Sequence, residues 1–180
     1  MTSSGAHNSP RVLLFDWGDT LMRDNPAEIR KMRDWLHVEA LPGANETLAT
    51  LRARGYRLII ATNAAESCAH DVLSALDRVD LAVHVERVYT ARDLGITKRD
   101  PRFYSVILAD LGVSAHDAVM IGDAWSSDVL AAHAAGLDAV WLSDAPAPGD
   151  LPPGVRQVRT LMDLLRLFPP LGVTPHLTTS

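Results

Sequence analysis

The sequence has little of what would set it apart from ordinary globular proteins. It contains one cysteine, Cys68, in 180 residues, so no disulfide can form within the chain. Its opening, MTSSGAHNSPR, lacks the apolar stretch of a signal peptide, and no apolar run approaches the roughly 18 residues that cross a bilayer. We therefore expect a cytoplasmic protein with no membrane partner.

Charge and aromatic side chains are also sparse. Charged residues make up 22% of the chain, aromatic residues 6%, and the formal net charge is -5. A mildly acidic surface repels phosphate backbones, so nucleic-acid binding is not expected. An anionic substrate would have to be held by local donors and a metal rather than by the field of the whole protein.

Short apolar runs alternate with helical patterns along the chain. Continuous runs at residues 12–15, 57–62, 118–121 and 139–142 predict buried parallel strands, with a weaker strand at 87–89. Helical patterns, most of them followed by glycine, cover 45–54, 65–76, 101–111, 126–135 and 161–167. This alternation predicts an α/β fold, a doubly wound, Rossmann-like three-layer sandwich with a mostly parallel sheet of about five strands.

Polar residues follow the predicted strands where each strand ends. In an open parallel sheet, ligands bind beyond the carboxyl ends of the strands, so these residues are the candidate site. They are Asp16, Asp19, Thr62, Asn63, Asp123 and Asp128, and Lys98 lies just before the helix that leads to the next strand.

Several carboxylates that converge in a cleft repel one another unless a cation neutralises them. Oxygen ligands favour magnesium, so Mg²⁺ is the expected cofactor. The hydroxyl, amide and ammonium groups around the carboxylates are suited to phosphoryl oxygens. Together these groups indicate phosphoryl transfer.

Four segments, in order, resemble the motifs of the haloacid dehalogenase superfamily. They are FDWGDTL, IIATN, ITKRDPRFY and VMIGDAWSSD, and the resemblance runs from about Val12 to Leu167. It implies a phosphohydrolase that cleaves a phosphomonoester. The expected partner is a phosphorylated small molecule or an exposed phosphate of a macromolecule, and a homo-oligomer is compatible with the sequence.

The resemblance also implies a role for each matching residue. Asp16 would be the nucleophile that forms an aspartyl-phosphate, and it would bind magnesium with Asp123 and the main-chain carbonyl of Gly18. Thr62 and Asn63 would hold the phosphoryl group. Lys98 would neutralise charge on the nucleophile and the phosphoryl group, and Asp128 would orient Lys98 or lie behind the metal ligands.

One position departs from the family pattern. Phosphatases of the family usually carry a second aspartate two residues after the nucleophile, to protonate the leaving oxygen and activate water, and here that residue is Gly18. The flexible backbone of glycine would let Asp19 substitute, which makes Asp19 a candidate catalytic residue. The alternative is that Asp19 only braces the loop through its own backbone.

The inserts above the predicted site are short. We expect a core at residues 11–168 with a minimal cap insert near 22–41, a disordered tail at 1–10 and a flexible tail at 169–180. The segment 26–37 predicts a single helix. Gly18 and the small cap also leave two other functions open, namely hydrolysis of carbon–phosphorus or carbon–halogen bonds, and a non-catalytic protein that binds metal or phosphate.

Overall fold

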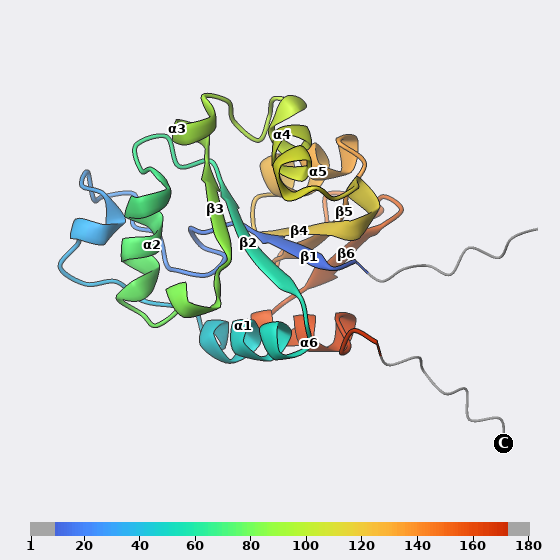
Figure 1. Cartoon of the computed structure of the whole chain (residues 1–180), viewed down its shortest axis with the longest axis horizontal. Coiled ribbons are helices and arrows are strands. Elements are labelled where there is room, and N and C mark those ends of the chain that lie inside the picture. Colours follow the sequence, from blue (N-terminus) through green and yellow to red (C-terminus); the bar gives the residue numbers. More distant parts are fainter. Residues whose placement is uncertain (1–9, 173–180) are drawn as a thin grey trace, which may run out of the picture.

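A single six-stranded sheet, in which every neighbouring pair of strands is parallel, forms the centre of the molecule (Figure 1). The structure is a computed structural model and describes residues 10–172. The strand order is β3-β2-β1-β4-β5-β6. The strands are β1 (Val12–Phe15), β2 (Arg57–Thr62), β3 (Arg87–Thr90), β4 (Ala118–Gly122), β5 (Asp138–Leu142) and β6 (Val155–Val158).

Helices cover both faces of this sheet. They are α1 (Ala44–Ala53), α2 (Ala69–Asp77), α3 (Ala91–Leu94), α4 (Arg102–Leu111), α5 (Ala131–Ala134) and α6 (Leu164–Leu167). Helices α1 and α6 lie on one side of the sheet in Figure 1, and α4 and α5 lie on the other. Short 3₁₀ turns occur at Met32–Asp34, Ala82–His84, Ala115–Asp117 and Leu161–Asp163, and a π-helical turn spans Trp125–Leu130.

Side chains of each buried strand alternate between two cores. In β1, Leu13 and Phe15 pack in the core beneath α1 and α6, whereas Leu14 packs with Phe103 and Ile107 of α4. Both faces of the strand are therefore apolar, which explains the continuous apolar runs in the sequence. The predicted three-layer α/β sandwich is confirmed, with six strands instead of about five.

The extra strand is β6, at the edge of the sheet beyond β5. Val155 and Val158 are buried, while Arg156 is exposed and Gln157 is half-buried. An edge strand that buries only part of its side chains does not have the continuous apolar run by which the other strands were predicted. The weaker strand expected at 87–89 is present as β3.

The segment 26–37 is not the single helix that the sequence predicts. Only the 3₁₀ turn Met32–Asp34 is helical there. Lys31 and Trp35, which flank this turn, both have extended backbones. Residues 22–41 belong to the segment that joins β1 to α1. We call residues 22–41 the strap.

The two expected tails fall mostly outside the described residues. Within the described part, residues that follow α6 are held against α1: the Tyr56 hydroxyl donates to the Pro169 carbonyl at 2.7 Å, and the Leu171 amide donates to the Arg54 carbonyl at 2.9 Å. The ordered chain therefore extends past residue 168. No helix in residues 10–172 is long and apolar enough to span a bilayer.

Candidate active site

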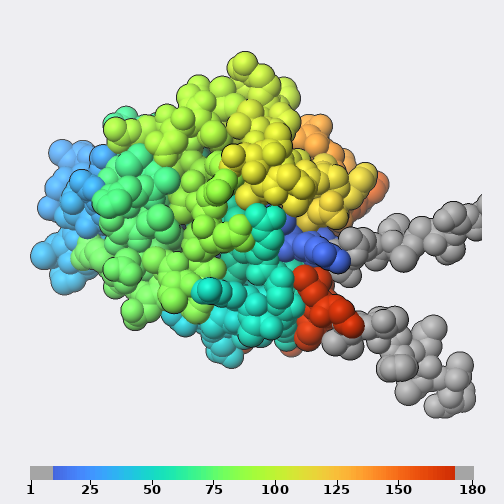
Figure 2. Space-filling view, in the orientation of Figure 1, coloured from blue at the N-terminus to red at the C-terminus, as the bar shows by residue number. Residues whose placement is uncertain are grey.

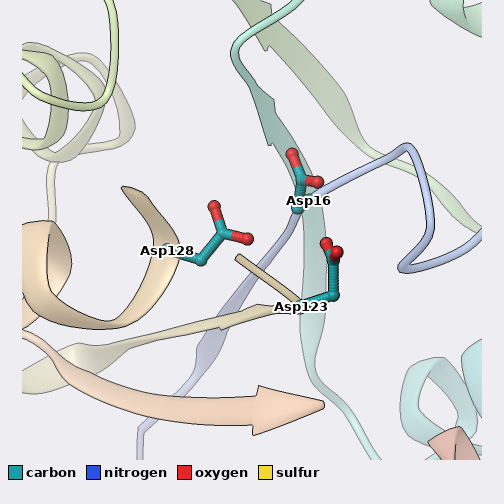
Figure 3. A group of neighbouring side chains, drawn as sticks. All are labelled: Asp16, Asp123 and Asp128. Atoms are coloured by element: carbon teal, nitrogen blue, oxygen red, sulfur yellow. The ribbon is translucent and has the colours of Figure 1, made fainter. Parts of the chain in front are cut away.

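Three carboxylates meet at the carboxyl ends of the two central strands. Asp16 follows β1, Asp123 follows β4, and Asp128 lies on the π-helical turn after β4. The Asp16 amide continues the strand pairing by donating to the Ile121 carbonyl at 2.9 Å. One carboxylate oxygen of each aspartate lies within 4.8 Å of the others, and Figure 3 shows the three side chains gathered from these three segments.

Lys98 is the cation of this group, and its side chain is only 1% exposed. Its Nζ donates to Asp16 Oδ1 at 2.6 Å and to Asp128 Oδ1 at 2.7 Å. Its backbone amide donates to Asn63 Oδ1 at 2.8 Å, which ties the loop before α4 to the end of β2. We call Asp16, Asp123, Asp128 and Lys98 the site cluster.

Burial and charge shift the protonation of the site cluster in a consistent way. Burial raises the pKa of Asp123, and the negative charge of Asp16 raises it further. Burial also raises the pKa of Asp128, and the Lys98 ammonium opposes this effect without cancelling it. Burial lowers the pKa of Lys98, but Asp16 and Asp128 together raise it above its ordinary value. The three carboxylates thus outnumber the single ammonium of Lys98 in a partly buried site.

Gly122 makes room for the Asp128 carboxylate. A Cβ atom built on Gly122 would lie 2.7 Å from the Asp128 Cβ and closer still to its carboxylate. On the other side, the Tyr104 hydroxyl donates to the Ser127 carbonyl at 3.0 Å and so fixes the turn that carries Asp128. The glycine of GDAWSSD is therefore needed for space, a role that the motif alone did not reveal.

Thr20 positions Asp123, although sequence reasoning assigned it no role. It is fully buried, and its hydroxyl donates to Asp123 Oδ1 at 3.1 Å and accepts from the Asp123 amide at 3.2 Å. The Trp141 indole donates to the Asp123 carbonyl at 2.8 Å. The only signal in the sequence was the threonine that ends DWGDT.

Thr62 and Asn63 line the cleft at the end of β2, next to Lys98. Thr62 is 5% exposed and its hydroxyl accepts from the Ala64 amide at 3.3 Å. Asn63 is exposed, and its Oδ1 accepts from the Lys98 backbone amide. Both residues therefore lie where the sequence predicts phosphoryl donors.

Asp19 lies apart from the residues that line the cleft. It adopts a left-handed backbone with φ of 52°, and its Oδ1 accepts from the Asp24 amide at 3.0 Å. Aspartate tolerates this conformation better than most residues. The geometry supports the bracing role for Asp19. It also brings the Asp24 side chain beside Gly18, the position where the family usually has its second aspartate.

A second charged group joins the strap to α2. The Asp71 carboxylate is 3% exposed and accepts from Lys31 Nζ at 2.5 Å; a guanidinium nitrogen of Arg33 lies at 2.6 Å and one of Arg92 at 3.7 Å. These contacts, the Lys31 hydrogen bond above all, hold the pKa of Asp71 well below its ordinary range. We call Asp71, Lys31, Arg33 and Arg92 the strap cluster.

Backbone carbonyls of the strap are bound as well. The Arg78 guanidinium donates to the carbonyls of Trp35 at 2.7 Å, Arg33 at 3.1 Å and Leu36 at 3.2 Å. A 3₁₀ turn with extended flanks leaves these carbonyls unpaired within the strap, so Arg78 satisfies them. In Figure 2 the blue atoms of the strap lie against the green atoms of the neighbouring segments.

The strap and three residues of the site cluster line an open cleft of about 910 Å³. Its floor is formed by Asp16, Lys98 and Asp128, and one wall by residues 28–35 of the strap. A cleft of this size is in the range that takes small organic ligands. The strap therefore narrows the approach to the carboxylates without covering them with a separate domain.

A Rossmann-like sheet with aspartates and a buried lysine at its switch point defines the class of the protein, an α/β protein with a candidate active site at the carboxyl ends of its central strands. A sequence model of the family described as haloacid dehalogenase-like hydrolase matches residues 27–136. The chain belongs to this family.

Individual relatives agree with the family. The chain is 35% identical over 109 residues to a phosphoserine phosphatase of Thermus thermophilus, covering 61% of this chain and 43% of the relative. It is 32% identical over 130 residues to a ribulose-1,5-bisphosphate 5-phosphatase of Halopiger xanaduensis, covering 69% and 53%. The chain thus spans about half the length of these curated relatives.

A solved structure shares the fold over nearly its whole length. An uncharacterized protein from Listeria monocytogenes superimposes with a TM-score of 0.77 at 24% identity, covering 87% of this chain and 95% of that chain. This likeness extends the shared fold to β-strands outside the segment that the family model matches.

Proposed function

We propose that this chain is a magnesium-dependent phosphohydrolase that cleaves a phosphomonoester through an aspartyl-phosphate on Asp16. The observation that carries the proposal is the placement of buried Lys98 between Asp16 and Asp128, with Asp123 beside them. Membership of the hydrolase family and the phosphatase names of both relatives support it.

The site cluster fits a bound magnesium ion. Its donors are all oxygens, which Mg²⁺ prefers, and three carboxylates face a single ammonium group. Asp16 Oδ1 and Asp128 Oδ1 are occupied by Lys98, so Asp16 Oδ2, Asp123 and the Gly18 carbonyl are the proposed ligands. The ion would supply positive charge to the phosphoryl oxygens as negative charge develops on them.

The chain's own residues divide the remaining work. Asp16 attacks phosphorus and forms a covalent intermediate, which splits one displacement into two easier ones. The Lys98 ammonium neutralises charge on Asp16 and on the phosphoryl group, and Asp128 keeps that ammonium in place. Thr62 and Asn63 donate hydrogen bonds to phosphoryl oxygens from preorganised positions.

The proposed substrate is a phosphorylated small molecule. The cleft has room for one, and both relatives are named for the phosphate esters of small metabolites. An exposed phosphate on a macromolecule is the alternative. Hydrolysis of a phosphopeptide at a higher kcat/KM than that of small phosphate esters would favour this alternative.

Hydrolysis of p-nitrophenyl phosphate tests the proposal. Wild type and Asp16→Asn are each assayed with magnesium and with a chelator. We expect release by wild type that depends on magnesium, and a loss of at least roughly 10³-fold in Asp16→Asn, because its amide cannot attack phosphorus. Activity that survives in Asp16→Asn would refute the covalent mechanism.

A second candidate function rests on Gly18. A site without a carboxylate at this position is also suited to breaking a carbon–phosphorus or carbon–halogen bond, where the leaving group differs from an alcohol. This function predicts phosphate release from a phosphonate, or halide release from a haloacid, under conditions where phosphomonoesters are not consumed.

A further inference from the structure

The proposed mechanism leaves one proton without a donor. When Asp16 displaces an alcohol from phosphorus, the leaving oxygen carries negative charge and needs a proton unless it is a very weak base. Within the site cluster, Asp16 is the nucleophile, and the Lys98 ammonium is shared between two carboxylates. The donor must therefore be sought elsewhere in the cleft.

Asp24 is a carboxylate of the cleft that the mechanism does not use. It lines the cleft together with Asp16, Gly18 and Lys98. A Cβ atom built on Gly18 would lie 3.5 Å from both the Cβ and the Oδ2 of Asp24. The Asp24 carboxylate thus lies in van der Waals contact with the place where a side chain two residues after the nucleophile would begin.

The local backbone fixes the direction of this carboxylate. The Asn25 amide donates to Asp24 Oδ1 at 2.8 Å, and the Asp24 amide donates to Asp19 Oδ1 at 3.0 Å. Oδ1 is therefore anchored on the strap, and Oδ2 is the oxygen near Gly18. The left-handed turn at Asp19 and its hydrogen bond to the Asp24 amide thus place Asp24 in the lining of the cleft.

Asp24 also differs from the acidic residues near it in having no ion-pair partner among residues 10–172. Glu28 pairs with Arg30 at 3.0 Å, and Asp34 pairs with Arg33 at 3.4 Å. Among the ion pairs of residues 10–172, none involves Asp24. In the described part of the chain, the Asp24 carboxylate is therefore not tied to a cation and points to the cleft with its Oδ2 beside Gly18.

We infer that Asp24 is the acid and base of the reaction, a role that rests on the proposed function. Asp16 forms a bond to phosphorus, the bond from phosphorus to the leaving oxygen breaks, and that oxygen takes the proton of the Asp24 carboxyl group. Asp24, now a carboxylate, accepts a proton from water as the water oxygen attacks the aspartyl-phosphate. The bond between phosphorus and Asp16 breaks, which releases phosphate and restores both aspartates.

Leaving groups of different basicity test this role. Asp24→Asn keeps an oxygen that can accept from the Asn25 amide, so the loop is expected to fold, which circular dichroism and Tm confirm. With β-glycerol phosphate, whose leaving oxygen needs a proton, kcat/KM should fall by roughly 10² to 10⁴. With 2,4-dinitrophenyl phosphate, whose leaving anion is stable, kcat/KM should change only a few-fold.

The second half-reaction supplies an independent readout. With dinitrophenyl phosphate, Asp24→Asn should release a burst of one dinitrophenolate per enzyme and then turn over slowly, because water is not activated. The matched control is Asp19→Asn, which keeps the oxygen that accepts from the Asp24 amide and should behave like wild type on both esters.

Each other outcome decides against the inference. Equal loss of kcat/KM on both esters in Asp24→Asn, no loss on either, or the burst pattern in Asp19→Asn would overturn the role of Asp24 while wild-type phosphatase activity stands. Absence of magnesium-dependent phosphate release by wild type from either ester would instead overturn the proposed function, and the inference with it.

Discussion

Within residues 10–172, the site cluster and the strap cluster are both groups of buried charge, and they are built in opposite ways. In the site cluster, three carboxylates gather around one ammonium, which contacts two of them, and Lys98 is 1% exposed. In the strap cluster, one carboxylate is shared by three cations, whose side chains are 30%, 35% and 46% exposed. The Asp71 side chain is nearly as buried as that of Asp128, so the two clusters do not differ in the burial of their carboxylates.

The difference lies in where the surplus charge goes. The extra cations of the strap cluster reach water, which solvates them, so the cluster is complete as it stands and serves as a joint. The extra carboxylates of the site cluster are held together at the carboxyl ends of the central strands. They repel one another there unless a cation is added. An internal surplus of one sign thus distinguishes a chemical site from a structural ion pair.

Removal of Lys98 should have the largest effect on the site cluster. Lys98→Met leaves Asp16 and Asp128 without their counter-charge, and breaking a buried pair in this way costs about 3 to 5 kcal/mol. We expect the free energy of unfolding to fall by this amount in urea titrations and turnover to be lost. Stability equal to that of wild type would mean that the ammonium does not hold the cluster together.

Gly122→Ala should disturb the same cluster without changing its charge. The added methyl displaces the Asp128 carboxylate from Lys98, and overpacking of this kind costs about 1 to 3 kcal/mol. Displacement of a positioning group by about 1 Å can reduce kcat by roughly 10²-fold. The control is Gly149→Ala, since a Cβ there meets nothing within 4 Å, and this variant should match wild type in both assays.

Asp71→Asn should affect the strap and spare the chemistry. Loss of the charged hydrogen bond from Lys31 and of the ion pair with Arg33 should cost about 1.5 to 3 kcal/mol, measured by urea denaturation. Turnover of p-nitrophenyl phosphate should stay within a few-fold of wild type. Asp77→Asn, an exposed change on the same helix, serves as the control; a loss of activity in Asp71→Asn as large as that in Gly122→Ala would break the distinction between the clusters.

The smallest effect concerns pH. The pKa of Asp71 is lowered in the folded protein from its ordinary value of 3.8, so its contribution to stability is present above that pH and is lost as pH falls through the folded pKa. The stability difference between wild type and Asp71→Asn should therefore begin to shrink at about pH 4, where the unfolded carboxyl takes up its proton, and should go on shrinking as pH falls toward the lowered pKa of the folded protein. A difference that stays constant over this range would show that the Asp71 charge does not stabilise the fold.

The sequence predicted the central sheet because buried parallel strands are continuous apolar runs. It missed β6, where Gln157 and Arg156 interrupt the run at the sheet edge. It predicted a single helix at residues 26–37, but side chains of α2 and Arg78 hold this segment in a mostly extended form. Such contacts join residues about 40 positions apart, and local periodicity does not record them.

The sequence predicted most residues of the site cluster, but it did not predict the residues that hold them in position. The strand-end rule predicted that Asp16, Thr62, Asp123 and Asp128 lie near one another, because parallel strands bring their carboxyl ends to one side of the sheet, whereas Lys98 was placed from its position before a helix. It did not find Thr20, which contacts Asp123 from 103 positions away. It proposed Asp19 as the replacement for the missing aspartate and did not name Asp24, because hydrogen bonds within the loop, and not sequence spacing, bring Asp24 beside Gly18.

Binding of magnesium tests the central claim most directly, since the surplus of carboxylates is the reason to expect a metal. Tm is measured against Mg²⁺ concentration for wild type, Asp123→Asn and Asp71→Asn. A ligand that binds only the folded state raises Tm with concentration. The account predicts such a rise in wild type and in Asp71→Asn and none in Asp123→Asn, whereas no rise in wild type, or an equal rise in Asp123→Asn, would contradict it.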